Sequence, residues 1–128
     1  MKVRLLSIMV DDQEKAAAFY TSVLGFVKKH DIPMGAHRWL TVVAADEPDG
    51  TEVVLEPMAF APARVYQQEL FSAGIPVTGF LVDDVQAEYD RLLKAGVKFS
   101  MAPTLMGTVT MAVFEDTCGN HLQVFQMM

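Results

Sequence analysis

The chain contains an internal repeat that spans about half of its length. The segment VDDQEKAAAFYTSVLGF (10–26) returns as VDDVQAEYDRLLKAGV (82–97), with the same opening and with a closing glycine followed by an apolar residue. Val82 follows Val10 by 72 residues and the closing glycines lie 71 residues apart, so the second copy is slightly shorter. A repeat of this length indicates two copies of one supersecondary unit, which limits the possible architectures before any single motif is considered.

The amino-acid composition is that of a globular domain. Of the 128 residues, 52% are hydrophobic and 20% are charged, and a chain of this length buries enough surface to form a core. No apolar run approaches the ~20 residues that a membrane-spanning helix requires, and the apolar stretch in MKVRLLSIMVDD is too short for a signal peptide. These features predict a cytoplasmic protein, and the single cysteine, Cys118, excludes an internal disulfide.

The charge of the chain argues against a nucleic-acid partner. The formal net charge is −6 and the isoelectric point is near 4.9. The basic residues are scattered, and only Lys28 and Lys29 are adjacent. Binding to a phosphate backbone draws its affinity from clustered Lys and Arg side chains. The sequence therefore predicts neither a nucleic-acid nor a membrane partner.

Each half of the chain is expected to begin with a strand followed by a capped helix. Asp12 and Asp84 stand where a carboxylate accepts hydrogen bonds from the free amides of the first helical turn. Gly25 and Gly96 stand where each helix ends, since glycine adopts a positive φ at little cost. The apolar residues at helical spacing in the first copy are Ala16, Phe19, Tyr20, Val23 and Leu24.

The remaining strand candidates give both halves the order β-α-β-β-β. Strands are expected at residues 4–10, 27–31, 38–45 and 52–56, and again at 77–82, 97–101, 111–115 and 121–125. A short helix is expected at 63–73. We therefore predict an α+β fold in a single domain, with module 1 at about 1–60, a linker helix at about 61–75 and module 2 at about 76–128.

A four-stranded sheet with one helix has only one face covered. The other face is apolar and stays exposed to solvent unless a second unit covers it, so we expect the two modules to form a cup-like mixed sheet. Strand alternation assigns one set of side chains to the inner face of each module. In module 1 these are Leu5, Ser7, Met9, Val54 and Glu56, and in module 2 they are Val77, Gly79, Leu81, His121, Gln123 and Phe125.

Three sequence patterns in this order resemble the vicinal oxygen chelate superfamily, which includes glyoxalase I, the extradiol dioxygenases, and the bleomycin and fosfomycin resistance proteins. They are VxD at 10–12 with FYxxxLGF at 19–26, VDDVxxxYxxLxxxGV at 82–97, and EDxxGNxLQ at 115–123. The resemblance covers nearly the whole chain and includes the duplication. It implies a homodimer in which each cavity is built from the first module of one chain and the second module of its partner.

The resemblance also implies four positions that hold a metal ion in the metal-using members. Two lie on the opening strands and commonly hold histidine, and here they are Leu5 and Val77. The other two lie on the last strand of each module, and here they are Glu56 and Gln123. A divalent catalytic ion needs at least three good N, O or S donors. We therefore predict no metal and no other cofactor, unless atypical ligands such as His30, His37 or His121 replace the usual ones.

The predicted cup is lined mainly by apolar side chains with a few polar groups, as small-molecule pockets are. Glu56 is a candidate general base for proton abstraction beside a carbonyl, although it could instead hydrogen-bond only Gln123 or a water. Trp39 and Phe60 are candidates for a wall on which a planar ligand stacks. The predicted ligand-binding residues are Leu5, Ser7, Trp39, Glu56, Phe60, Val77, His121, Gln123 and Phe125.

Three functions remain open at this point. The first is a binding protein, similar to the bleomycin resistance proteins, that holds a small and largely apolar molecule in an intersubunit cavity without a metal. The second is a lyase, isomerase or dioxygenase-like enzyme, either metal-free with Glu56 as its base or metal-dependent through atypical ligands. A third possibility, a domain that works through protein partners, predicts no well-formed apolar cavity. The sequence names no ligand, because one scaffold hosts unrelated chemistries.

Overall fold

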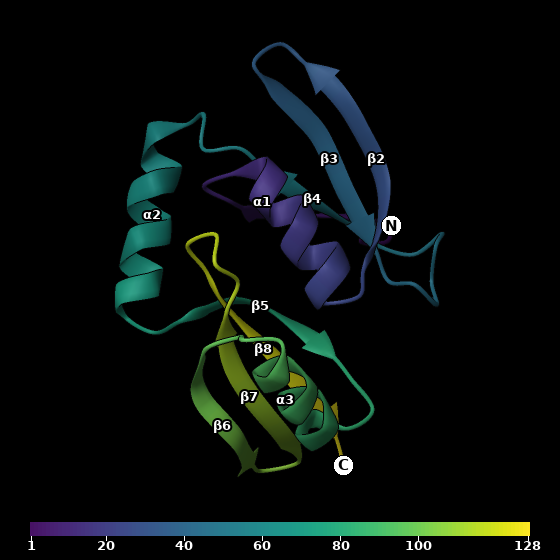
Figure 1. Cartoon of the computed structure of the whole chain (residues 1–128), viewed down its shortest axis with the longest axis vertical. Coiled ribbons are helices and arrows are strands. Elements are labelled where there is room, and N and C mark those ends of the chain that lie inside the picture. The colour runs from purple at the N-terminus through teal and green to yellow at the C-terminus, as the bar shows by residue number, and fades with distance from the viewer. The chain divides into compact units, whose positions relative to one another are not determined.

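The computed structural model describes residues 1–128 and divides into two compact units, unit 1 at Met1–Val65 and unit 2 at Tyr66–Met128. Both units have the element order β-α-β-β-β, which confirms the predicted α+β fold (Figure 1). Unit 1 contains β1 (Leu5–Met9), α1 (Gln13–Ala18), the π-helical turn η1 (Phe19–Val23), β2 (Val27–Met34), β3 (His37–Val43) and β4 (Glu52–Glu56). Unit 2 contains β5 (Pro76–Leu81), α3 (Val85–Lys94), β6 (Phe99–Met106), β7 (Val109–Glu115) and β8 (His121–Met127). The remaining helix, α2 (Ala61–Ser72), crosses the division between the units.

The two copies of the sequence repeat build the same helix start and the same helix end. The carboxylate at the start accepts a hydrogen bond from the backbone amide three residues further on, at 3.1 Å for Asp12 and 3.0 Å for Asp84. The glycines that follow the helices, Gly25 and Gly96, have φ of +90° and +87°. Both predicted caps and both predicted ends are therefore confirmed. None of the helices is both long and apolar enough to cross a lipid bilayer.

The first helix differs from its prediction in one respect, because it changes from an α-helix to a π-helical turn at Phe19. The wider turn buries both Phe19 and Tyr20, which are 8% and 0% exposed. Their rings meet edge to face with centroids 5.8 Å apart. A pattern with a period of 3.6 residues identified these side chains but not the wider turn that buries them side by side.

The sheet of unit 1 has the strand order β1-β4-β3-β2, with β1 parallel to β4 and the other pairs antiparallel. Ser7 lies opposite Val54 and Met9 lies opposite Glu56, which confirms that these residues share a face. Helix α1 packs against β3 and β4 on the other face (Figure 1). The core between them contains Ile8, Val10, Ala16, Tyr20, Leu40, Val42, Val53 and Leu55.

The sheet of unit 2 repeats this topology in the order β5-β8-β7-β6. Gly79 lies opposite Gln123, and Leu81 lies opposite Phe125. The register shifts between Pro76 and Gly79, so that the partner of His121 is Pro76. Helix α3 packs against β7 and β8, and the core contains Val85, Leu92, Ala112, Phe114, Leu122 and Val124.

Two strands are longer than the sequence predicts, and both contain a proline. Strand β2 continues past the predicted end at 31 through Pro33, and β6 continues past 101 through Pro103. Each is an edge strand of its sheet. Proline is tolerated at an edge because its missing N–H can face away from the neighbouring strand. The predicted strand ends at 31 and 101 were therefore too early.

Candidate functional site

The sheet of unit 1 presents four of the nine predicted ligand-binding residues on the face that points away from α1, which we call the distal face of unit 1. The β1–β4 register and the alternation of side chains along the strands define it. Its members are Leu5, Ser7, Met9, Trp39, Thr41, Glu52, Val54 and Glu56. This face therefore combines four apolar with four polar side chains, and its two carboxylates, Glu52 and Glu56, come from the same strand.

Glu56 forms a hydrogen-bonded pair with Ser7. The Ser7 hydroxyl donates to Oε1 of Glu56 at 3.1 Å, across the parallel pair β1 and β4. Glu56 is half-buried and Ser7 is exposed. The partner of Glu56 in this unit is thus a hydroxyl from a neighbouring strand, which the sequence did not predict. The pair offers a ligand one negatively charged acceptor beside one hydroxyl.

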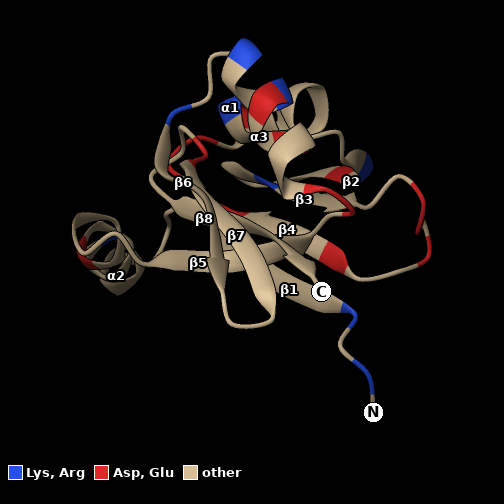
Figure 2. Cartoon of the chain, turned by 90° about the horizontal axis from the view of Figure 1, so that it is seen from below, with Lys and Arg blue, Asp and Glu red and all other residues tan.

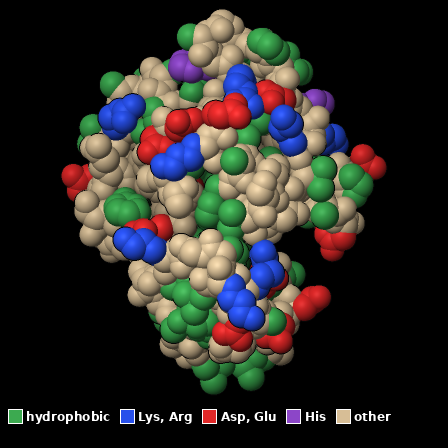
Figure 3. Space-filling model, in the orientation of Figure 1, with side chains coloured by type: hydrophobic (Ala, Val, Ile, Leu, Met, Phe, Trp, Pro, Cys, Tyr) green, Lys and Arg blue, Asp and Glu red, His purple; other side chains and the backbone are tan.

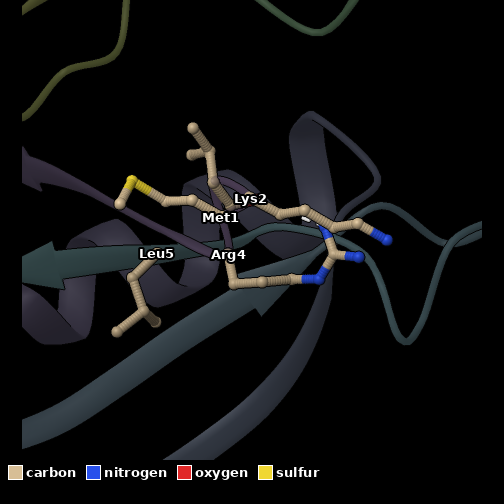
Figure 4. A pocket seen from close by; sticks show the side chains of 5 residues that line it. Met1, Lys2, Arg4 and Leu5 are labelled. Atoms are coloured by element: carbon tan, nitrogen blue, oxygen red, sulfur yellow. Dashed lines mark hydrogen bonds between the residues drawn. The ribbon is translucent and has the colours of Figure 1, made fainter.

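Leu5 lies at the other end of the distal face, opposite Glu52. It lines an open pocket of about 640 Å³ together with the four residues that precede it, Met1, Lys2, Val3 and Arg4. The side chains of Met1 and Leu5 point to one side, whereas the nitrogen-bearing ends of Lys2 and Arg4 lie together on the other (Figure 4). Leu5 is 54% exposed. It therefore contributes apolar surface near the chain start rather than a polar group.

The positions at which the superfamily holds a metal do not fit a divalent ion in this chain. Leu5 has no donor atom, and it lies opposite Glu52, whereas Glu56 lies opposite Met9. Four residues along a strand correspond to roughly 13 Å, so Leu5 and Glu56 are too far apart to share one ion. The structure contains no group of three or more His, Cys, Asp or Glu side chains placed to hold a metal ion. The donor chemistry of these positions does not support metal coordination.

The two aromatic candidates of unit 1 differ in their surroundings. Trp39 is half-buried in β3 and lies opposite Ile32 of β2. Strands β3 and β4 pair only at Thr41–Val54 and Val42–Val53, and beyond these pairs the side-chain amide of Gln13 bonds to the backbone of both Arg38 and Leu55. Phe60, in contrast, precedes α2 and is 69% exposed. Trp39 therefore lies on the same sheet face as the Ser7–Glu56 pair, whereas Phe60 lies outside the sheet.

The sequence analysis missed a second polar group on the distal face, formed by His30, Thr41 and Glu52. The Thr41 hydroxyl donates to Oε1 of Glu52 at 2.9 Å, and Nε2 of His30 lies 3.5 Å from the same oxygen. Strand alternation already placed Glu52 on the face of Glu56, so this carboxylate was open to prediction. The position of His30 depends on an irregular strand pairing that the sequence does not reveal.

In unit 2, Gln123 and Gly79 form a close pair. A Cβ atom added at Gly79 would lie 2.8 Å from Nε2 of Gln123. The glycine therefore gives the Gln123 amide the space to lie over β5. Val77 and Phe125, the other predicted residues of these strands, are half-buried. Besides apolar side chains, this face has the amide of Gln123 and, at the end of β7, Glu115 opposite His121.

His121 is buried in unit 2, with only 6% of its surface exposed. Its ring stacks on Phe71 of α2, with centroids 4.4 Å apart and planes inclined by 19°. Its Nδ1 atom is buried without a hydrogen-bond partner. The packing places His121 beside an aromatic ring, and the prediction that it contacts a ligand stays a prediction.

A separate cavity of about 380 Å³ lies beside α1, lined by residues that include Glu14 and Arg38. The Arg38 guanidinium donates to both carboxylate oxygens of Asp31 and to Glu14. The hydrogen bonds that Arg38 donates to the Asp31 carboxylate raise the pKa of Arg38 above its usual range. The charges around this cavity compensate one another, so we assign no ligand to it.

Charged side chains of both signs are mixed on one face of the molecule, and they are sparse on the strands of unit 2. On the face shown in Figure 3, Lys and Arg side chains lie among Asp and Glu side chains and do not form a basic patch. Figure 2 shows β5, β7 and β8 almost free of charge. Among the four strands of unit 2, Glu115 is the single Lys, Arg, Asp or Glu residue. The sheet of unit 2 therefore suits an apolar ligand better than an ionic one.

Fold, repeat and site positions together define the class of protein. The model of the Glyoxalase/Bleomycin resistance protein/Dioxygenase superfamily matches residues 2–124, and the chain belongs to this superfamily. Among its relatives, YurT of Bacillus subtilis (strain 168) is 53% identical over 126 residues, which cover 98% of this chain and 99% of YurT.

Two solved structures are similar over almost their full length. The crystal structure of UcmS2 has a TM-score of 0.83 and 36% identity, and the match covers 98% of this chain and 97% of UcmS2. TnmS3, an antibiotic binding protein from Streptomyces sp. CB03234, has a TM-score of 0.79 and 30% identity, with 100% and 97% of the two chains covered. These similarities confirm the fold and the family predicted from the sequence.

Proposed function

We propose that the protein is a homodimer that binds a small, largely apolar molecule in a cavity between its subunits, without a divalent metal. The observation that carries the proposal is the Ser7–Glu56 pair, which shares a sheet face with Trp39 and with the apolar side chains of Leu5 and Met9. Few polar groups on an apolar, partly aromatic surface are typical of small-molecule sites. The similarity to TnmS3, which is described as an antibiotic binding protein, supports a binding role.

The binding proposal is tested with the only tryptophan of the chain, Trp39, as a built-in probe. Titration with 4-nitroanisole, a neutral planar aromatic compound, is expected to quench the Trp39 fluorescence to saturation. Glu56→Gln is expected to leave this affinity nearly unchanged, because the probe has no group that needs the charge. A linear, non-saturating quench would contradict the proposal. Sedimentation of the same samples checks the dimer.

The metal part of the proposal has its own test. Elemental analysis of the purified protein and thermal shifts with Ni²⁺, Zn²⁺ and Mn²⁺ are expected to show no stoichiometric metal and no stabilisation. A ligand that binds only the folded state raises the melting temperature by mass action. A metal held by Glu56 together with any histidine would overturn this part and favour a metal-dependent enzyme with atypical ligands.

A metal-free enzyme is the second candidate, and the position of Glu56 favours it. A half-buried carboxylate beside a hydroxyl is suited to abstract a proton next to a carbonyl group. Exchange of the methyl protons of acetophenone in D₂O, followed by NMR, separates the candidates. Faster exchange than in buffer that is lost in Glu56→Gln, but not in the turn variant Glu47→Gln, would show that Glu56 acts as a base. A pure binding protein gives no acceleration.

A further inference from the structure

We propose that His30, held by Glu52, accepts the proton of an acidic hydroxyl, a phenol or an enol, on a planar ligand that stacks on Trp39. This inference rests on the proposed binding function and adds the chemical class of the ligand. It assigns a second polar position on the distal face of unit 1, distinct from the Ser7–Glu56 pair. The geometry of β2, β3 and β4 carries the argument.

An irregular pairing between β2 and β3 turns His30 toward this face. Lys28 pairs with Val42 and His30 pairs with Thr41, so Lys29 is an extra residue in β2. The backbone N–H of His30 donates to the Thr41 hydroxyl at 3.2 Å. The side chain of Thr41 thus accepts a backbone hydrogen bond at the point where the regular pairing of β2 and β3 is interrupted. Such bulges redirect side chains and are frequent next to functional sites.

The Thr41 hydroxyl also fixes the carboxylate that contacts His30. Thr41 is fully buried and donates to Oε1 of Glu52 at 2.9 Å. The same oxygen lies 3.5 Å from Nε2 of His30. The side chain of Glu52 is 20% exposed, whereas that of His30 is 42% exposed. A ligand therefore reaches the imidazole more easily than the carboxylate behind it.

This arrangement gives the two imidazole nitrogens different roles. A neutral imidazole has one N–H donor and one acceptor nitrogen. Because Nε2 faces the Glu52 carboxylate at 3.5 Å, we place the N–H on Nε2, which makes Nδ1 the acceptor. Proton transfer breaks the O–H bond of the ligand, leaves its electron pair on oxygen and forms an N–H bond at Nδ1. The products are a phenolate or enolate and an imidazolium, whose charge Glu52 balances.

Trp39 sets the shape of the ligand. Ile32 is the partner of Trp39, and His30 is the partner of Thr41, so His30 and Trp39 are diagonal neighbours across β2 and β3. Diagonal neighbours on a sheet are roughly 7–8 Å apart, which one aromatic ring system spans. A flat ligand stacked on Trp39 therefore brings a ring hydroxyl to the edge of His30. An aliphatic alcohol would lack both the stacking and the acidity.

The test compares 4-nitrophenol with 4-nitroanisole, which has the same ring but no proton to give. Quenching of Trp39 fluorescence measures the affinity for each probe, and the visible absorption band of nitrophenolate measures proton transfer. The wild-type protein is expected to increase this band. In His30→Gln, the affinity for 4-nitrophenol is expected to fall about tenfold and the added band to disappear, while the affinity for 4-nitroanisole stays unchanged.

Two further variants make the result specific. Glu52→Gln is expected to weaken 4-nitrophenol binding in the same direction, because the imidazolium loses its balancing charge. His37→Gln, the same change at an exposed histidine at the start of β3, is expected to have no effect. Circular dichroism verifies that each variant is folded.

The outcomes separate this inference from the function on which it rests. If 4-nitroanisole binds and His30→Gln leaves both the affinity for 4-nitrophenol and the phenolate band unchanged, the role of His30 is wrong and the binding function stands. If neither probe binds the wild-type protein, the proposed binding function fails together with this inference.

Discussion

The amide of Gln67 donates one hydrogen bond to Oδ1 of Asn120 at 3.1 Å and a second, also at 3.1 Å, to the carbonyl of Cys118. Gln67 is 6% exposed, and Cys118 and Asn120 are buried. The carboxylate of Asp116 holds the same turn, because its Oδ1 accepts from the backbone amides of Cys118 and Asn120. Gln67 therefore joins α2 to the turn that leads into β8.

Gln67→Ala is expected to lower the free energy of unfolding by about 1–3 kcal/mol, because it leaves buried acceptors without their donor. Urea denaturation followed by circular dichroism measures the change. Gln68→Ala is the matched control, since Gln68 is exposed on the same helix and its loss should change stability by less than about 0.5 kcal/mol. Equal effects of the two variants would mean that the buried hydrogen bonds contribute nothing measurable.

Gly119 is expected to tolerate no side chain, for two separate reasons. Its φ is +96°, and a Cβ atom would lie 2.7 Å from Oε1 of Gln67. Gly119→Ala should therefore combine backbone strain with overlap and cost about 2–4 kcal/mol. Gly107→Ala, with φ of +67° and no atom within 4 Å of the new Cβ, carries only the backbone strain, about 1–2 kcal/mol.

A double-mutant cycle checks the overlap at Gly119 directly. In the Gln67→Ala background the added Cβ meets no amide, so the penalty of Gly119→Ala should fall toward that of Gly107→Ala. Gln67→Ala, Gly119→Ala, their double variant and Gly107→Ala are compared by urea denaturation under the same conditions. A penalty that stays the same in both backgrounds would assign the whole effect to the backbone of Gly119.

The sequence predicted the features of the fold that depend on local chemistry. Asp12 and Asp84 cap helices because a short carboxylate that precedes a helix can accept hydrogen bonds from the free amides of the first turn. The repeat supported both predictions, because the same residue stands at the same place in each copy. The shared face of Ser7, Val54 and Glu56 followed from the alternation of side chains along strands. Both rules need only neighbouring residues and an approximate strand start.

Features that depend on pairing between strands were not predicted. The bulge at Lys29 has no glycine or proline to mark it, yet it decides that His30 lies beside Glu52. The parallel register places Leu5 opposite Glu52, so that Leu5 lies four residues along the strand from the position opposite Glu56. Residue spacing within one strand contains no information about either relation, because register is a property of two strands together.

The helix cap at Asp84 provides a prediction with an adjacent control. The side chain of Asp84 accepts from the amide of Ala87 at 3.0 Å, whereas Asp83 is exposed and lies just before the helix. Asp84→Ala is expected to destabilise the protein by about 1 kcal/mol, because one amide of the first turn loses its acceptor. Asp83→Ala should have a smaller effect in the same thermal denaturation. A larger effect at Asp83 would show that Asp83, and not Asp84, caps the helix.

The ion pair between Asp31 and Arg38 predicts how stability depends on pH. Nε and one terminal nitrogen of Arg38 donate to the two carboxylate oxygens of Asp31 at 2.8 and 2.7 Å. This hydrogen bonding by Arg38, followed by that of Lys28, holds the pKa of Asp31 well below its usual range. Both Asp31 and Arg38 side chains are about one-quarter exposed. The folded state therefore keeps Asp31 ionised in acid where the unfolded chain does not.

The sign of the effect follows from proton linkage. An unfolded Asp titrates near pH 3.9, and the pKa of Asp31 is lower when folded, so the stabilising effect is present above about pH 4 and is lost as the pH falls. Asp31→Asn should therefore be less stable than the wild type near neutral pH, and the difference in urea midpoint should shrink in acid. Asp49→Asn is the control, because Asp49 is fully exposed and lies 3.9 Å from Lys29. A difference between Asp31→Asn and the wild type that stays constant from neutral to acid pH would show that the pair does not control the acid response.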